Sequence, residues 1–204
     1  MMRETLLPSW AALVEIIRQL EEQPYHWPVG RNTLRAVAYA ATREGLPTGF
    51  VYRRGRFGPF SRDVESTESK LININLLQEK RVGRLFLVES GPNFDRIRRD
   101  FQASLNQWAS IIEKTTDLFM RVNTERAGVV ATVIFAADEL KQEKKSSPTE
   151  TEVLDAVIRW SQRRRPPLDE MVIASTIRNL GMLRWLDVKP DVRLRLPEEE
   201  SILA

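Results

Sequence analysis

The sequence has 204 residues, and its 31 Lys and Arg against 28 Asp and Glu leave a formal net charge of only +3. It contains no cysteine, which excludes thiol nucleophiles, disulfides and cysteine zinc sites and favours an intracellular compartment. No apolar run reaches the roughly 18 residues of a membrane span, and the N-terminus lacks the pattern of a signal peptide. We therefore expect a cytoplasmic protein without membrane contact.

Three amphipathic helices open the predicted fold. Apolar residues recur at helical spacing over residues 10–20 and again over 34–41, and Pro24 ends the first of these helices. A third helix begins after Ser61, whose hydroxyl is suited to accept a hydrogen bond from the first turn. A short strand and a loop that is rich in glycine and proline separate the second and third helices.

A β-hairpin follows the third helix. Residues 76–79 and 85–89 have strand-like composition, and the connection between them carries Gly83, which suits a tight turn. Helices followed by a two-stranded wing are the order of a winged helix-turn-helix. We therefore predict a winged-helix-like unit over residues 1–92.

The second half repeats this order without repeating the sequence. Apolar residues recur every three or four positions over 93–122, which predicts one long connecting helix. Two further helices are expected after residue 123, and Thr149 with Glu152 forms a capping box at the start of one of them. A last helix and a hairpin of residues 185–188 and 192–196, with Pro190 at its turn, complete the pattern.

The predicted fold is mainly α with small β-hairpins. Two winged-helix-like units, residues 1–92 and 123–204, are joined by the long helix over 93–122. The repeated order concerns the architecture alone, because the two halves share negligible sequence identity.

Motifs of catalysis are missing from the sequence. It has no Walker loop, no Gly-x-Gly-x-x-Gly, no Gly-x-Ser-x-Gly and no His-Glu-x-x-His. The single histidine, His26, stands between two aromatic residues, where a packed or surface histidine is the favoured interpretation over a general base. Neighbouring acidic pairs point about 100° apart on a helix, so they are poorly placed to share a metal ion. We predict no catalytic residue, no metal site and no cofactor.

Arginines alternate with aromatic residues in the loop from residue 53 to residue 61. This mixture suits nucleic acid, because phosphates pair with guanidinium groups and bases stack on rings, and it equally suits a protein interface. We expect the partner to contact charged residues of this loop and of the first wing, which are Arg53, Arg54, Arg56, Arg62, Asp63, Arg81 and Arg84.

The same loop has a structural interpretation. Phe57 and Phe60 would fill the core, while Gly58 and Pro59 would shape the turn into the helix that Ser61 caps. A second basic run, residues 163–165, is the next candidate for partner contact. Its alternative interpretation is a solvated surface.

Several of these segments carry a family resemblance. Gly45-Leu-Pro-Thr-Gly-Phe50, Gly55-Arg-Phe-Gly-Pro-Phe-Ser61 and Leu76-Leu-Gln-Glu-Lys-Arg-Val-Gly-Arg-Leu-Phe86 resemble the region that follows the macro domain in bacterial macro-domain proteins. These are antitoxins of the DarG class, which partner the DNA ADP-ribosylating toxin DarT. The likeness continues through residues 112–119, 152–155 and 163–169, and so extends over most of the chain.

The resemblance implies a toxin-neutralising antitoxin module without enzymatic activity. The implied partners are a protein toxin that is a DNA ADP-ribosyltransferase and, if this is the C-terminal part of a longer protein, a macro domain. The sequence has only 9 glycines and no glycine-rich loop for ADP-ribose, so the removal of ADP-ribose is not carried over. The alternative is a winged-helix transcriptional regulator that binds DNA.

Overall fold

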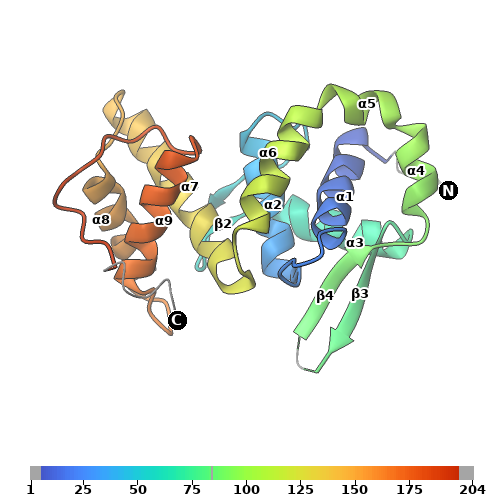
Figure 1. The fold of residues 1–204 in the computed structure, drawn as a ribbon, viewed down its shortest axis with the longest axis horizontal. Coiled ribbons are helices and arrows are strands. Elements are labelled where there is room, and N and C mark those ends of the chain that lie inside the picture. Colours follow the sequence, from blue (N-terminus) through green and yellow to red (C-terminus); the bar gives the residue numbers. More distant parts are fainter. Residues whose placement is uncertain (1–5, 84, 198–204) are drawn as a thin grey trace. The chain divides into compact units, whose positions relative to one another are not determined.

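The computed structural model describes residues 6–83 and 85–197 (Figure 1). It is mainly helical with two small antiparallel hairpins, which confirms the predicted fold class. The chain forms two compact units. Unit 1 comprises the residues up to Arg53 together with Phe60–Gly128, and unit 2 comprises Arg54–Pro59 together with the residues from Val129 onward.

Unit 1 is built around its first helix. Every residue from Ala11 to Ile17 in this helix is buried, and the helix packs against its five neighbours α2, α4, α5, α6 and β4. Figure 1 shows α4, α5 and α6 curving around α1. The helices of this unit are α1 (Pro8–Glu21), α2 (Arg31–Arg43), α3 (Arg62–Asn73), α4 (Phe94–Asp100), α5 (Gln102–Gln107) and α6 (Ala109–Met120).

The single helix predicted for residues 93–122 is wrong. The chain leaves helical geometry at Phe101 and at Trp108, where φ is −105° and −104°, so three short helices replace one long helix. Phe94, Leu105 and Ile112 nevertheless remain buried, as their spacing predicted. A one-residue interruption hardly alters apolar periodicity, yet it lets the segment bend and follow α1.

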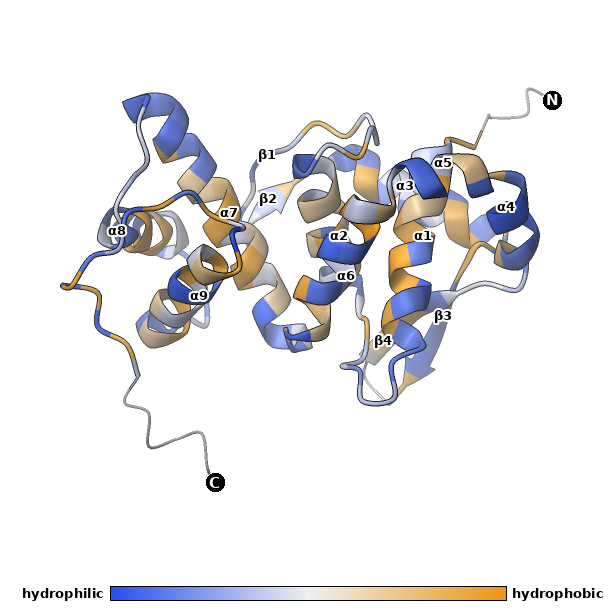
Figure 2. Cartoon of the chain, turned by 45° about the horizontal axis from the view of Figure 1, so that its top comes forward, coloured by the Kyte–Doolittle hydropathy of each residue, from blue (hydrophilic) through white to orange (hydrophobic). Residues whose placement is uncertain are grey.

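The predicted wing is present. Strands β3 (Leu77–Val82) and β4 (Leu85–Ser90) pair antiparallel, and Gly83 lies in their turn at a φ of +62°, in the left-handed region that favours glycine. The carbonyl of Val29 accepts a hydrogen bond from the backbone N–H of Val88 at 2.7 Å, which extends the sheet beyond β4. Hydrophilic residues prevail along β3 (Figure 2).

A smaller hairpin precedes α3. It consists of β1 (Arg53–Arg54) and β2 (Pro59–Phe60), and its turn is closed by a hydrogen bond of 2.9 Å from Gly55 N–H to the carbonyl of Gly58. Ser61 occupies the N-cap position of α3, but its hydroxyl accepts no hydrogen bond from the first turn. It donates to the carboxylate of Asp63 at 3.4 Å instead, so the predicted N-cap position is confirmed but the predicted capping hydrogen bond is wrong.

Unit 2 contains most of α7 (Thr124–Lys144) together with α8 (Glu150–Ser161) and α9 (Glu170–Met182), and α8 packs against α9. The predicted capping box of α8 is confirmed. The hydroxyl of Thr149 accepts from Glu152 N–H at 3.2 Å, and the carboxylate of Glu152 accepts from Thr149 N–H at 2.8 Å. None of the helices in the described ranges is long and apolar enough to cross a membrane.

The second hairpin, predicted for residues 185–196, is wrong, because residues 183–197 form no named strand. The backbone of this segment pairs with residues at the start of α8 instead. Lys189 N–H donates to the carbonyl of Pro148 at 2.8 Å, and Asp191 N–H donates to the carboxylate of Glu150 at 2.9 Å. The apolar side chains divide between the core, where Leu194 is buried, and solvent, where Val192 is fully exposed.

Candidate functional site

The small hairpin takes part in a cluster of arginines and aromatic rings within unit 2. This arginine–aromatic cluster comprises Arg54, Arg56, Phe57, Trp160 and Arg164. The indole N–H of Trp160 donates to the carbonyl of Gly55 at 2.9 Å, although the two residues are 105 positions apart in the sequence. The Trp160 ring also packs against Phe135, with 5.4 Å between ring centroids. Helix α8 thereby holds the loop in place.

Arg54 is fixed from two sides. Its guanidinium lies 4.9 Å from the centroid of the Trp160 ring, and its Nε donates to the carboxylate of Glu139 at 2.7 Å. The charge of Arg54 is therefore compensated within unit 2. This ion pair is partly exposed, and its main effect is to order the side chain.

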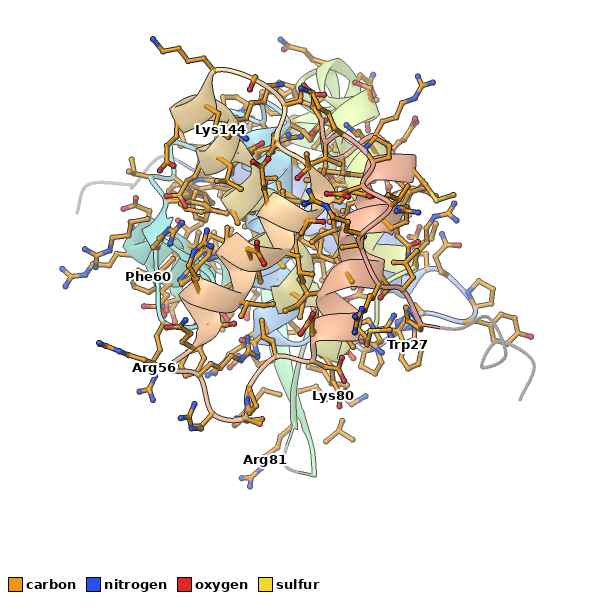
Figure 3. All side chains as sticks on the ribbon, turned by 90° about the vertical axis from the view of Figure 1, so that its left-hand side faces the viewer. Trp27, Arg56, Phe60, Lys80, Arg81 and Lys144 are labelled. Atoms are coloured by element: carbon orange, nitrogen blue, oxygen red, sulfur yellow. The ribbon has the colours of Figure 1, made fainter. Side chains whose placement is uncertain are left out.

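Phe57 projects into solvent at the tip of the loop. Its side chain is 57% exposed, so the predicted role as a core residue is wrong. The guanidinium groups of Arg56 and Arg164 lie 5.2 and 5.8 Å from its ring centroid. Figure 3 shows Arg56 by its label. The ring lies at the tip of a two-strand hairpin that turns at Gly58, where φ is +134°. Phe60 in β2 is half-buried.

Five of the residues singled out from the sequence line a shallow hollow in unit 1. The hollow lies beside the start of α3 and is lined by Val51, Arg53, Phe60, Ser61, Arg62 and Asp63. The guanidinium carbon of Arg53 lies 5.4 Å from the centroid of the Phe60 ring. The Asp63 carboxylate, which accepts from Val51 N–H at 3.5 Å, occupies the start of the helix, where an anion would otherwise bind.

A second aromatic side chain is exposed on the wing of unit 1. This wing face comprises Arg31, Glu79, Arg81 and Phe86. Phe86 is 45% exposed and pairs across the hairpin with Arg81, while the guanidinium of Arg31 lies 4.9 Å from the centroid of its ring. Arg31 also binds both carboxylate oxygens of Glu79, one of them at 2.7 Å. Nε of Arg81 donates to the carbonyl of Gly83 in the turn at 3.1 Å; Figure 3 labels this side chain.

The charges behind the wing face continue along α2 and α3. Glu68 is buried and lies 3.7 Å from Arg31 and 3.6 Å from Arg35, and Arg35 also reaches Glu65 at 3.4 Å. Burial raises the pKa of Glu68, and the two arginines counteract part of that rise. The hydrogen bond from Arg31 lowers the pKa of Glu79. Unit 1 therefore presents paired charges of both signs.

The seven charged residues predicted for partner contact are distributed over both units. Arg53, Arg62 and Asp63 line the hollow, and Arg81 lies on the wing face, all in unit 1. Arg54 and Arg56 belong to the cluster in unit 2, and Arg84 lies outside the described residues. Sequence reasoning missed Trp160, Glu139, Arg31 and Phe86, because only tertiary structure brings them to these positions.

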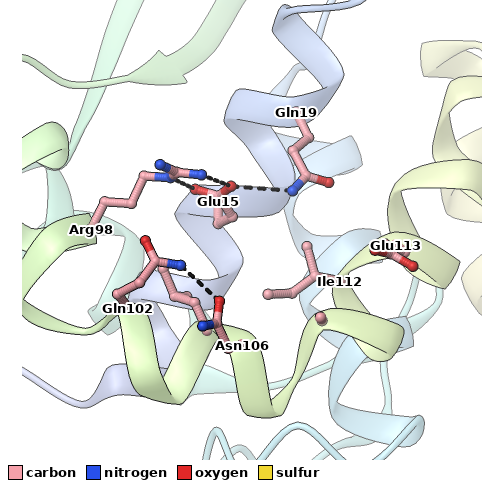
Figure 4. Close-up of a pocket in the computed structure, with 9 residues that line it drawn as sticks. Glu15, Gln19, Arg98, Gln102, Asn106, Ile112 and Glu113 are labelled. Carbon is pink, nitrogen blue, oxygen red and sulfur yellow. Dashed lines mark hydrogen bonds and ion pairs between the residues drawn. The ribbon is translucent and has the colours of Figure 1, made fainter.

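A pocket of about 120 Å³, lined mainly by polar side chains, lies between α1 and α4–α6 (Figure 4). The buried carboxylate of Glu15 accepts from Arg98 at 2.8 and 3.3 Å and from the side chain of Gln19 at 3.1 Å. Gln102 donates to Asn106 at 2.8 Å within α5, on the wall of the same pocket. These polar groups already bind one another, so we assign them to the packing of unit 1.

In the described ranges, no group of three or more histidine, aspartate or glutamate side chains could hold a metal ion. His26 is exposed, and its ring Nδ1 lies 3.2 Å from the carbonyl of Trp27.

Neither a scan against protein-family models nor a search of curated proteins finds a match to this sequence.

Proposed function

We propose that this chain is a non-catalytic antitoxin module that acts in the cytoplasm. It binds a protein toxin, a DNA ADP-ribosyltransferase of the DarT type, and keeps that toxin inactive. The resemblance of its motifs suggests the class of partner. The observation that carries the proposal is the wing face of unit 1, where Phe86 is exposed between Arg31 and Arg81.

The composition of the wing face suits a protein interface. Aromatic residues and arginine are enriched at the centres of such interfaces and supply most of their binding energy. Arg31 is held by Glu79 and by the Phe86 ring before any partner arrives. Little side-chain freedom is therefore lost when the partner binds, and that lowers the cost of association.

DNA binding through the winged helix is the second candidate, and the exposed Lys80 and Arg81 on the wing favour it. Helix α3, which would enter the major groove, argues against it. Its solvent-facing residues include Asp63 and Glu65, which repel phosphates. Binding of DNA would weaken steeply with salt, whereas a mixed apolar and charged protein contact persists at moderate salt.

The proposal is tested by adding the chain in increasing amounts to the toxin while it modifies DNA. We expect inhibition to be complete near one chain per toxin. Phe86→Ala should weaken the complex by about tenfold or more, the scale of a central aromatic contact. Tyr25→Ala removes an aromatic residue that is even more exposed, from the same unit, and should leave affinity unchanged.

Full toxin activity in an excess of folded chain would exclude the antitoxin function. Inhibition that responds equally to Phe86→Ala and Tyr25→Ala would leave the function standing and move the contact away from the wing face.

A further inference from the structure

The exposed phenylalanine of unit 2 has different electrostatic surroundings from Phe86. Arg56 and Arg164 lie against the Phe57 ring, and neither has an acidic partner among the residues that the structure describes. In the cluster, only Arg54 forms an ion pair in the described part of the chain, with Glu139. We propose that the arginine–aromatic cluster binds single-stranded nucleic acid.

Neighbouring arginines add to the positive charge of the cluster. The run of residues 163–165 adds two further arginines beside Arg164, and both are exposed. Uncompensated guanidinium groups of this kind pair with phosphates, since each phosphate contact releases condensed counterions and so favours binding. On the wing face, by contrast, the arginine that lies against the Phe86 ring, Arg31, is already paired with Glu79.

The exposed ring supplies the second element of recognition. Single strands bind where a basic surface is combined with aromatic rings, because every unpaired base can stack on a ring or on a guanidinium plane. Phe57, with Arg56 and Arg164 beside it, forms such a platform. The bases of a duplex are stacked on one another and cannot stack on this platform. An acidic peptide can pair with the arginines but has no base to stack on the ring.

The platform is organised before a ligand binds. The Trp160 indole holds the carbonyl of Gly55, and Gly55 N–H closes the turn on the carbonyl of Gly58 at 2.9 Å. Arg54, in the first strand of the hairpin, contacts both the Trp160 ring and the carboxylate of Glu139, and these contacts hold the base of the loop. Nucleic acid therefore meets a loop that is already ordered, which reduces the entropy lost on binding.

The experiment measures fluorescence anisotropy of a labelled oligonucleotide of about 15 thymidines, with the full chain, at about 50 and 200 mM salt. We expect saturable binding that weakens with salt. Phe57→Ala should weaken it by about tenfold, the scale of losing one stacked base, and Arg56→Ala with Arg164→Ala by at least as much. Arg195→Ala removes the same charge from another exposed position of unit 2 and should change affinity less than about twofold.

Three results would overturn the proposal. These are no binding by the wild-type chain at the lower salt, equal losses in Phe57→Ala and Arg195→Ala, and equal affinity for a duplex or for a glutamate peptide of the same length. Toxin inhibition by the Phe57→Ala variant should stay at the wild-type level, so this test and the test of the antitoxin function can fail separately.

Discussion

Replacing Glu150 with glutamine should destabilise unit 2 more than any other single exchange of a carboxylate for an amide in this unit. The Glu150 side chain is 2% exposed and lies at the start of α8. Its two oxygens accept from Arg178 at 2.6 and 2.8 Å, and one of them also accepts from Asp191 N–H at 2.9 Å. One side chain thus ties together α8, α9 and the segment after α9.

The expected loss follows from these contacts. Each hydrogen bond to a charged group contributes about 1.5 to 3 kcal/mol, and breaking a buried ion pair costs about 3 to 5 kcal/mol. The Arg178 side chain is 33% exposed, so water can replace part of what it loses, and we expect about 3 kcal/mol. For a chain of this size, that corresponds to a melting temperature about 6 to 12 °C lower.

The assay is urea unfolding followed by circular dichroism. Glu143→Gln is the control, because it makes the same exchange at an exposed position of α7. A Glu150→Gln variant within about 0.5 kcal/mol of this control would show that water replaces the Arg178 contact at little cost, which would refute the reasoning.

The remaining predictions concern pH, packing and exposure. Burial alone would raise the pKa of Glu150, but the bonds from Arg178 and Asp191 N–H lower it below its ordinary value. The stability difference between wild type and Glu150→Gln should therefore be complete above about pH 5, and it should shrink as the pH falls through the lowered value. Equal differences in urea titrations at pH 7 and pH 3 would contradict this. Gly91→Ala should cost more than about 2 kcal/mol, because its Cβ would lie 2.3 Å from the carbonyl oxygen of Asn75, and an unchanged melting temperature would disprove the clash. Phe57→Ala should change stability by less than about 0.5 kcal/mol and Phe94→Ala by about 3 to 5 kcal/mol, and similar values for the two would show that Phe57 packs into the core.

The sequence predicts local structure well where a single segment determines it. The capping box of Thr149 and Glu152 and the glycine turn at Gly83 depend on neighbouring residues alone, and both are present. The hairpin predicted for 185–196 fails because a distant residue competes for its backbone. The carboxylate of Glu150 accepts a hydrogen bond from Asp191 N–H, and Lys189 forms a β-bridge with Thr149 at the start of α8. The backbone of this segment therefore pairs with α8 and not with a second strand.

The candidate surfaces were only partly predictable for the same reason. Alternating arginines and aromatic residues identified the loop that contains Phe57, but no local signal shows that this ring faces solvent. Its support comes from Trp160, 105 residues from Gly55, and from Glu139, 85 residues from Arg54. The partner of Arg31 on the wing, Glu79, is 48 residues away.

Amide hydrogen exchange, measured on the chain alone and in complex with the toxin, tests the proposed binding face most directly. Backbone amides of β3 and β4 should exchange more slowly in the complex, because the partner would cover the wing around Phe86 and Arg81. A stable complex in which the exchange of residues 77–82 and 85–90 is unchanged would contradict the account.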